Sequence, residues 1–202
     1  MDVIPVVQYR IDHEDRLAEV NDGWLAFAKA NGGQALQPSQ ILGRPLWDYL
    51  ADATTRQLYH AMVQRLRQGG PPVRFRFRCD AASRRRLLAM EITADRAGGA
   101  RFSVTSVLEE PRPSVPLLEP EHRREGRLLA MCGWCKRSRL PSGAWVEVEE
   151  AVQALSLFGG GPLPGVTHGI CPPCYTAIAG ALEDPAVGAT GTVTVGAIHA
   201  AH

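Results

Sequence analysis

The chain has 202 residues, a length that fits one ordinary domain with a small second unit and excludes a single large barrel. Its composition, 45% hydrophobic and 21% charged, is that of a globular protein and excludes a collagenous or wholly disordered chain. The 22 basic and 21 acidic side chains leave a formal charge of +1, which excludes a global field able to hold a polyanion or an acidic membrane.

The sequence carries no visible targeting or membrane segment. Residues 1–10 lack a basic stretch followed by a long apolar run, so no secretory signal is expected. No segment reaches the ~18 uninterrupted apolar residues of a membrane span. We therefore expect a cytoplasmic protein without a membrane partner. In that compartment the five cysteines indicate metal or redox chemistry rather than a disulfide framework.

The first fifty residues alternate strand-like and helix-like patterns. Residues 6–11 and 16–20 are typical of two strands that form a hairpin around a polar turn. Asn21 or Asp22 can cap a helix over residues 23–30, which an Asn-Gly-Gly sequence would end. A polar loop and a short helical turn are expected after it.

A longer helix and three strands are predicted next. Asp52 or Thr54 can cap a helix that runs to Arg67, because apolar residues recur at every fourth position and a Gly-Gly-Pro-Pro sequence follows. The alternating patterns beyond the prolines predict antiparallel strands over residues 73–79, 86–93 and 101–108.

This order of elements predicts an α+β domain with one five-stranded antiparallel sheet and helices on one face. Residues 20–25 and 41–48 resemble the N-x-x-W and x-L-G-x-x-L-W-D signatures of PAS sensor domains. The resemblance covers about residues 5–109 and implies a PAS-like fold. Trp24 and Trp47 would then wall the PAS-like core, and the alternative is that they line a pocket for a small, unidentified apolar ligand.

Proline and charge are concentrated in residues 109–116, which suits an extended linker. The charged residues 119–127 favour a solvated helix. The last residues lack an amphipathic period and favour a disordered or loosely attached tail. The expected organisation is a PAS-like domain over 1–110, a linker over 111–127, a cysteine-rich module over 128–182 and a tail over 183–202.

Two Cys-x-x-Cys pairs give the strongest chemical signal. Four thiolates at about 2.3 Å satisfy tetrahedral zinc, and four protein ligands leave no open position for water, so the site is expected to be structural. An apolar pattern from Trp145 to Leu155 predicts a helix between the pairs. His168 lies three residues before the second pair and is either a hydrogen-bond donor to a thiolate or a replacement ligand. The expected ligands are Cys132, Cys135, Cys171 and Cys174.

The cysteine region also resembles a known module. Residues 131–137, 145–149 and 167–174 resemble a cysteine-rich module that follows sensor domains in bacterial signalling proteins. The resemblance spans about residues 128–182. It implies a signalling context and no particular activity.

Three readings compete with these expectations. The cysteine pairs could form a dithiol switch, although neither lies in a thioredoxin-like βαβ pattern. Alternating Arg74, Arg76 and Arg78 could bind an anionic partner, or could form a solvated sheet face that discourages aggregation. That strand face lacks the aromatic platforms expected for single-stranded nucleic acid. His60 could serve as a haem ligand, but one isolated histidine favours an exposed helix residue.

No carboxylate pair has the spacing or context of a general acid and base, so no enzymatic activity is expected. The sequence favours a cytoplasmic bacterial sensory or regulatory adaptor. In it, a PAS-like ligand or partner domain is coupled to a structural zinc module, with output through protein contact or homodimerisation. The alternatives are a zinc-dependent nucleic-acid-binding regulator and a thiol or zinc redox sensor.

Overall fold

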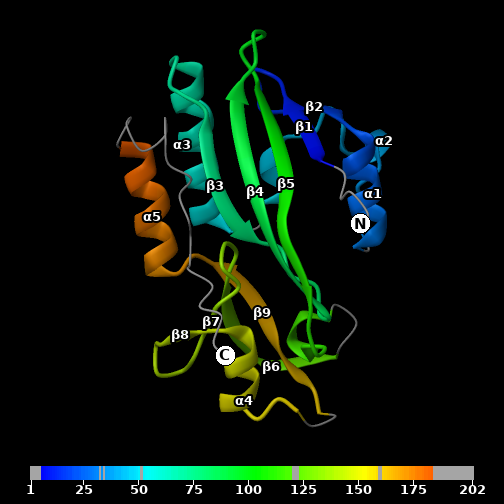
Figure 1. The fold of residues 1–202 in the computed structure, drawn as a ribbon, viewed down its shortest axis with the longest axis vertical. Coiled ribbons are helices and arrows are strands. Elements are labelled where there is room, and N and C mark those ends of the chain that lie inside the picture. The colour runs from blue at the N-terminus through cyan, green and yellow to red at the C-terminus, as the bar shows by residue number, and fades with distance from the viewer. Residues whose placement is uncertain are drawn as a thin grey trace.

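The computed structural model describes residues 6–31, 33, 35–50, 52–119, 123–158 and 161–183. The tail expected from residue 183 onward therefore lies outside the described residues, except for its first residue. The described chain forms two sheets: a large sheet of five strands and a small sheet of four strands (Figure 1). The two sheets share one hydrophobic core.

The N-terminal hairpin consists of β1 (Val7–Ile11) and β2 (Leu17–Val20), paired antiparallel as expected. Helix α1 (Asp22–Ala30) follows directly, and its cap is Asn21, whose Oδ1 accepts a hydrogen bond from the Trp24 N–H at 2.9 Å. The same oxygen accepts from the Gln8 N–H at 2.9 Å. One side chain therefore satisfies a free helix donor and fixes the helix to β1.

Two short helices and one long helix complete the first layer. They are α2 (Pro38–Ile41), the 3-10 helix η1 (Leu46–Tyr49) and α3 (Ala53–Arg67). The Asp52 carboxylate accepts from the Thr55 N–H at 2.6 Å and so begins α3. Leu58, Met62 and Leu66 are buried on one face of the helix, which confirms the predicted apolar stripe.

The large sheet is completed by β3 (Val73–Arg78), β4 (Arg84–Ala94) and β5 (Ala100–Pro111). Its strand order is β2-β1-β5-β4-β3, and every neighbouring pair is antiparallel. The chain between β2 and β3 supplies helices α1, α2 and α3. The expected fold class, an α+β fold with a five-stranded antiparallel sheet, is confirmed.

Side-chain alternation gives the large sheet one apolar face. Phe75, Ile92 and Phe102 are almost fully buried there, together with Tyr9 and Ile11. Between β4 and β5, Gly99 must be glycine because a Cβ at that position would lie 2.0 Å from the Ile11 carbonyl oxygen. The turn at this end therefore packs directly on β1.

The segment expected to be a linker is folded in its described part. Strand β5 continues to Pro111, and η2 (Pro116–Leu118) follows it with Leu117 buried. The helix expected over 119–127 is wrong, because β6 (Arg124–Cys132) begins inside that range. Strand β6 is stabilised by parallel pairing with a distant strand, a long-range interaction that the local charge pattern does not contain.

The small sheet has the strand order β8-β7-β6-β9. Its other strands are β7 (Ser138–Arg139), β8 (Trp145–Val146) and β9 (Leu163–Gly169). The helix expected between the cysteine pairs is α4 (Val148–Ala154), with Trp145 on β8 rather than in the helix. Val148 and Val152 pack against Leu117, Leu129 and Met131 in a second, smaller core.

Helix α5 (Pro172–Glu183) joins the small sheet to the large one. It lies alongside α3, where Arg65 Nη1 donates to the Ala181 carbonyl at 2.9 Å (Figure 1). Ile178 and the four paired cysteines belong to the same buried cluster as the core of the large sheet. In the described part of the chain, no helix has the length and apolarity that crossing a membrane would require.

Candidate functional site

Four cysteines converge where the small sheet meets the core of the large sheet. Cys132 ends β6 and Cys171 lies two residues after β9, so the parallel pairing of these strands brings both to the same end of the small sheet. Cys135 lies in the turn after β6, and Cys174 lies in the first turn of α5. The two cysteine pairs are far apart in the sequence, and the pairing of β6 with β9 and the start of α5 bring them together.

The turn at the first pair is held by the backbone. The Cys132 N–H donates to the Arg137 carbonyl at 2.8 Å, and the Lys136 N–H donates to the Cys132 carbonyl at 3.0 Å. Lys136 has a φ of 63°, a left-handed conformation that reverses the chain within the turn. The Gly133 N–H donates to the Gly169 carbonyl at 2.8 Å, which ties the turn to the end of β9.

The cysteine geometry suits a tetrahedral metal ion. The four sulfur atoms all lie within 4.8 Å of one another, and Cys135 Sγ lies 3.6 Å from Cys171 Sγ. Zinc with four thiolates at 2.3 Å requires sulfur separations of about 3.8 Å. The cysteine side chains are all buried, at 0–5% exposure. The residues therefore fit a closed site for a soft or borderline metal ion such as zinc.

The electrostatics of the four thiols also favours a bound metal ion. The hydrogen bond with Cys135 lowers the pKa of Cys132, while the hydrogen bond with Cys132 raises the pKa of both Cys135 and Cys174. The cluster by itself thus holds thiolate and thiol side by side, because several buried thiolates repel one another. A divalent cation at the centre would remove that repulsion and favour the deprotonated form of all four cysteines.

His168 takes no place in this group. It is exposed on β9, opposite Met131 in the strand pairing, and the candidate metal group in the described residues consists of the four cysteines. His168 instead lines a small cavity of about 310 Å³ that also touches Gly133, Trp134 and Lys136.

Trp134, between the first two cysteines, joins the cysteine turn to the large sheet. Its ring lies 4.7 Å from Phe75 and 5.7 Å from Tyr59, centroid to centroid, and it is 3% exposed. Its backbone carbonyl accepts from the Arg78 N–H at 2.7 Å. Any change in the cysteine turn therefore changes the packing of the aromatic core.

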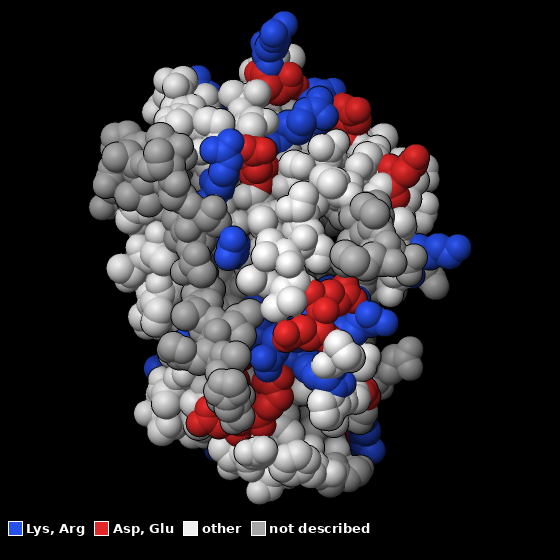
Figure 2. All heavy atoms as spheres, viewed as in Figure 1, with Lys and Arg blue, Asp and Glu red and all other residues white. Residues whose placement is uncertain are grey.

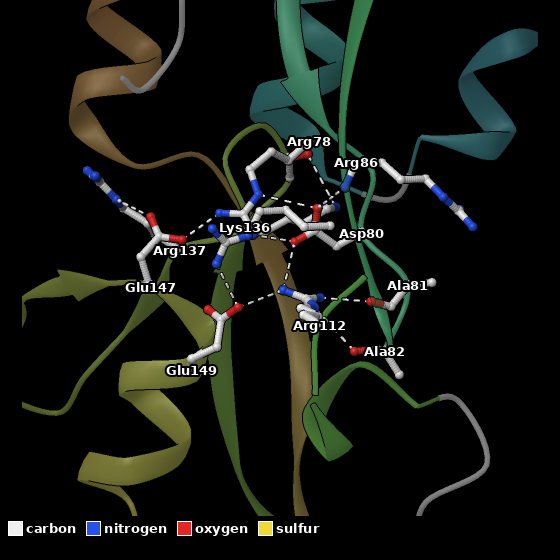
Figure 3. A network of polar contacts seen from close by, with 12 residues as sticks. Arg78, Asp80, Ala81, Ala82, Arg86, Arg112, Lys136, Arg137, Glu147 and Glu149 are labelled. Carbon is white, nitrogen blue, oxygen red and sulfur yellow. Dashed lines mark hydrogen bonds and ion pairs between the residues drawn. The ribbon is translucent and has the colours of Figure 1, made fainter. Parts of the chain in front are cut away.

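A buried ionic network fastens the two sheets together (Figure 3). Its centre is Asp80, fully buried after β3, which pairs with Arg78 and, at 3.1 Å, with Arg112. Both arginine side chains are only 7% exposed. The Asp80 carboxylate also accepts from the Arg86 N–H at 3.1 Å. The negative charge of Asp80 is thus compensated by groups on β3, on β4 and in the segment after β5.

The network reaches the small sheet through two glutamates near α4. Glu147 pairs with Arg78 and, at 3.1 Å, with Arg137. Glu149 pairs with Arg85 at 2.9 Å and with Arg112 at 2.9 Å, a contact that Figure 3 shows. Because arginines of the large-sheet unit meet glutamates of the small-sheet unit, the network fixes the relative position of the two sheets.

Glu149 makes this junction sensitive to acid. Burial raises its pKa, but its backbone hydrogen bond and the guanidinium groups of Arg85 and Arg112 lower the pKa more. The pKa of Glu149 in the folded protein is therefore below its ordinary value. Its ion pairs stabilise the fold at pH values above the pKa of Glu149 in the unfolded chain, and this stabilisation is lost as the pH falls through the pKa of the folded state. We expect Glu149→Gln to reduce the fall in thermal midpoint between about pH 5 and 3. The exposed Glu150→Gln, one residue away, should keep the wild-type pH dependence.

The alternating arginines of β3, for which an anionic partner was one of two alternatives, do not form a free basic surface. Arg78 is buried and paired with Asp80 and Glu147, and Arg74 pairs with Glu91 across β3 and β4. Arg76 lies half-buried between them, with its Nε atom buried and without a hydrogen bond in the described residues. On the face shown in Figure 2, positive and negative side chains are intermixed. The arrangement favours a structural role for Arg78 over contact with an anion.

A second feature is a cavity of about 720 Å³ between α1 and the apolar face of the large sheet. Its walls are mostly apolar, as in small-molecule sites of this size. Trp24 and Trp47 both pack against the core, as expected, and Trp24 also lines this cavity, which was the alternative role. Trp47 does not line it: its ring lies 3.7 Å from the His60 ring, and its Nε1 donates to Asp15 at 3.0 Å. The contact with the Trp47 ring also gives His60 a structural partner.

Sequence patterns missed the residues that connect these features. Asp80 and Arg112 lie in segments that look like a turn and a linker, and nothing local indicates that they meet. Tyr9 and Tyr59, which both line the large cavity, lie in a predicted strand and a predicted helix, and nothing in the sequence marks them as cavity residues. Trp134 offered one signal, since large aromatic side chains contribute much of the buried area of protein cores.

No protein-family model matches the chain, and no curated protein matches it. Among solved structures, a sensory box sensor histidine kinase from Vibrio cholerae is similar at 9% identity, over 52% of this chain and 84% of that one, with a TM-score of 0.37. The PAS domain of BvgS from Bordetella pertussis is similar at 15% identity, over 51% and 73% respectively, with a TM-score of 0.34. The fold assignment here rests on the strand order and pairing described above.

Proposed function

We propose that this chain is a cytoplasmic bacterial sensory or regulatory adaptor. In this proposal the large-sheet unit binds a small ligand in its cavity, and the four cysteines bind one structural zinc ion. The signal leaves through contact with another protein or a second copy of the chain, and the chain has no enzymatic activity of its own. The observation that carries the proposal is Trp134, which lies within the cysteine turn and packs into the core beside the cavity.

The coupling follows from shared residues. Tyr59 and Phe77 line both the large cavity and the small cavity beside the cysteine turn. A ligand that moves the Tyr59 ring therefore changes the surface against which Trp134 packs. A packed core changes between discrete arrangements rather than deforming gradually, so small shifts are transmitted across it.

Native mass spectrometry of the full chain, purified without chelator, tests the metal. We expect one zinc ion per chain, because the four thiolates complete its coordination. The same spectrum reports any retained organic molecule and the number of chains in the particle. A metal-free chain with intact thiols would contradict the zinc assignment.

Hydrogen exchange tests the coupling. Removing zinc with a chelator in reducing buffer is expected to accelerate exchange in α3 and β3, which contact Trp134. Exchange in the β1–β2 hairpin should change less, because that hairpin lies at the far edge of the large sheet. Unchanged protection of α3 and β3 after zinc is lost would refute coupling while leaving zinc binding intact.

The two alternative functions receive less support. A nucleic-acid-binding regulator would use free basic side chains on β3 and at residues 136–139, but Arg74, Arg78 and Arg137 are paired with carboxylates. A thiol redox sensor would need thiols that an oxidant can reach, and the four clustered cysteines are buried. The paired arginines and the buried cysteines both favour the adaptor with a structural metal.

A further inference from the structure

A bulge in the large sheet places an ion pair on its cavity side. The register between β4 and β5 shifts between Leu87 and Leu88, which leaves one extra residue in β5. Successive side chains of a strand point to opposite faces, so an extra residue moves the side chains after it to the other face. Glu109 is therefore brought opposite Arg86, and both residues line the large cavity. Bulges commonly re-aim a side chain in this way beside a functional site.

The cavity changes from apolar to charged along β4 and β5. Three cross-strand pairs line it, in this order: Met90 with Val104, Leu88 with Ser106, and Arg86 with Glu109. The path along β4 from Met90 to Arg86 is about 14 Å long, at about 3.4 Å per residue. A ligand that lies along this path meets apolar side chains at one end and charged groups at the other.

The charged end of the cavity carries more positive than negative charge. Its charged residues, within the described lining, are Arg84, Arg86 and Glu109. Both guanidinium groups approach the same carboxylate oxygen, Glu109 Oε1: Arg84 Nη1 lies at 2.9 Å and Arg86 Nε at 3.6 Å. One carboxylate balances only one of the two guanidinium groups. The remaining positive charge favours a ligand with one negative charge at this end.

Arg86 is the better placed of the two arginines. Its side chain is only 13% exposed, whereas that of Arg84 is 56% exposed, so water screens Arg86 less. Its guanidinium group lies over the Phe27 ring at 5.8 Å, and its Nη1 donates to Asn31 Oδ1 at 2.6 Å. Both contacts hold the group at the cavity wall. Its Nη2 has no hydrogen-bond partner among the described residues and is not a buried atom, so it is available to a ligand.

We propose that the large cavity binds an amphipathic monocarboxylate, whose apolar part lies along Met90 and Leu88 and whose carboxylate pairs with Arg86 and Arg84. The proposal rests on the proposed function, which assigns ligand binding to this cavity. The volume of about 720 Å³ accommodates such a molecule. Glu109 competes with the ligand carboxylate for the same guanidinium groups, so it weakens ligand binding.

Decanoate and 1-decanol are the probes, because they share an alkyl chain and differ in charge. Isothermal titration calorimetry measures their affinities for the zinc-loaded full chain. We expect decanoate to bind about tenfold or more tightly than 1-decanol, which corresponds to one hydrogen bond with a charged group. Arg86→Gln should remove this preference by weakening decanoate alone. A variant that simply folds poorly would weaken both probes.

Glu109→Gln should have the opposite effect. Because it removes the competing carboxylate, decanoate should bind about two- to fivefold more tightly, and 1-decanol should bind as before. Loss of folding cannot produce tighter binding. Arg101→Gln is the matched control: it removes an arginine of β5 that is 46% exposed and lies outside the cavity lining. Both affinities should keep their wild-type values in this variant.

Equal affinity of the wild-type chain for the two probes would overturn the carboxylate assignment and leave ligand binding in the cavity standing. The same conclusion follows if Arg86→Gln keeps the preference for decanoate. Binding of neither probe to the wild-type chain would also overturn the assignment. Ligand binding itself fails only if native mass spectrometry, in addition, finds no retained organic molecule.

Discussion

Replacing Cys132 and Cys171 together with serine is expected to abolish zinc binding and to unfold the cysteine module in reducing buffer. Apparent binding free energies of structural zinc are about 10–16 kcal/mol, more than the whole stability of many domains. Because Trp134 and Ile178 belong to the core of the large sheet, the loss should spread beyond the small sheet. Native mass spectrometry measures the metal, and thermal unfolding followed by near-ultraviolet circular dichroism measures the core.

Cys79→Ser is the matched control for this experiment. Cys79 is the fifth cysteine, half-buried after β3 and outside the group of four sulfur atoms. Its replacement should leave one zinc ion per chain and cost about 1 kcal/mol or less. If the double serine variant retained its thermal midpoint, the cluster would not be a structural metal site.

Asp80→Asn is expected to be the most damaging single substitution outside the cysteines. The carboxylate is fully buried between Arg78 and Arg112, whose side chains are each 7% exposed. Removing its charge leaves two buried guanidinium groups incompletely compensated, which costs about 3–5 kcal/mol in comparable buried pairs. For a chain of this size that corresponds to a fall of roughly 10 °C in the thermal midpoint. Differential scanning calorimetry at neutral pH measures it.

Glu91→Gln provides the comparison on the same sheet. Glu91 pairs with Arg74, but both side chains are at least 40% exposed, so water screens the interaction. The expected cost is within about 0.5 kcal/mol. Equal losses in Asp80→Asn and Glu91→Gln would show that burial of the network contributes nothing to stability.

Local patterns were sufficient for most elements of the large sheet. Helix α3 has its cap at Asp52 and its apolar stripe in the sequence, and β3 has strict alternation. The four cysteines were also recognisable, because Cys-x-x-Cys spacing is a property of a short turn. Features that depend on residues close together in the chain can therefore be predicted from the sequence.

Elements that depend on distant partners were not recognisable. The charged residues before Leu128 favour a solvated helix locally, yet they begin β6 because β9 pairs with it. The same holds for Arg78, which alternates like an exposed strand residue until Asp80 and Glu147 meet it from other segments. Trp47 packs against the core as expected, but its contacts with His60 and Asp15 depend on residues from other segments and were not recognisable.

The sequence by itself determined the α+β class, the order of the strands and main helices in the large-sheet unit, and the identity of the four candidate metal ligands. All of these follow from periodicity, caps and short spacings, which are interactions between residues close in the chain. Only the tertiary structure decided that the two sheets share one core, that Asp80 joins them, and that Tyr9 and Tyr59 face a cavity. Those facts depend on contacts between residues far apart in the chain, and a local pattern does not specify its distant partners.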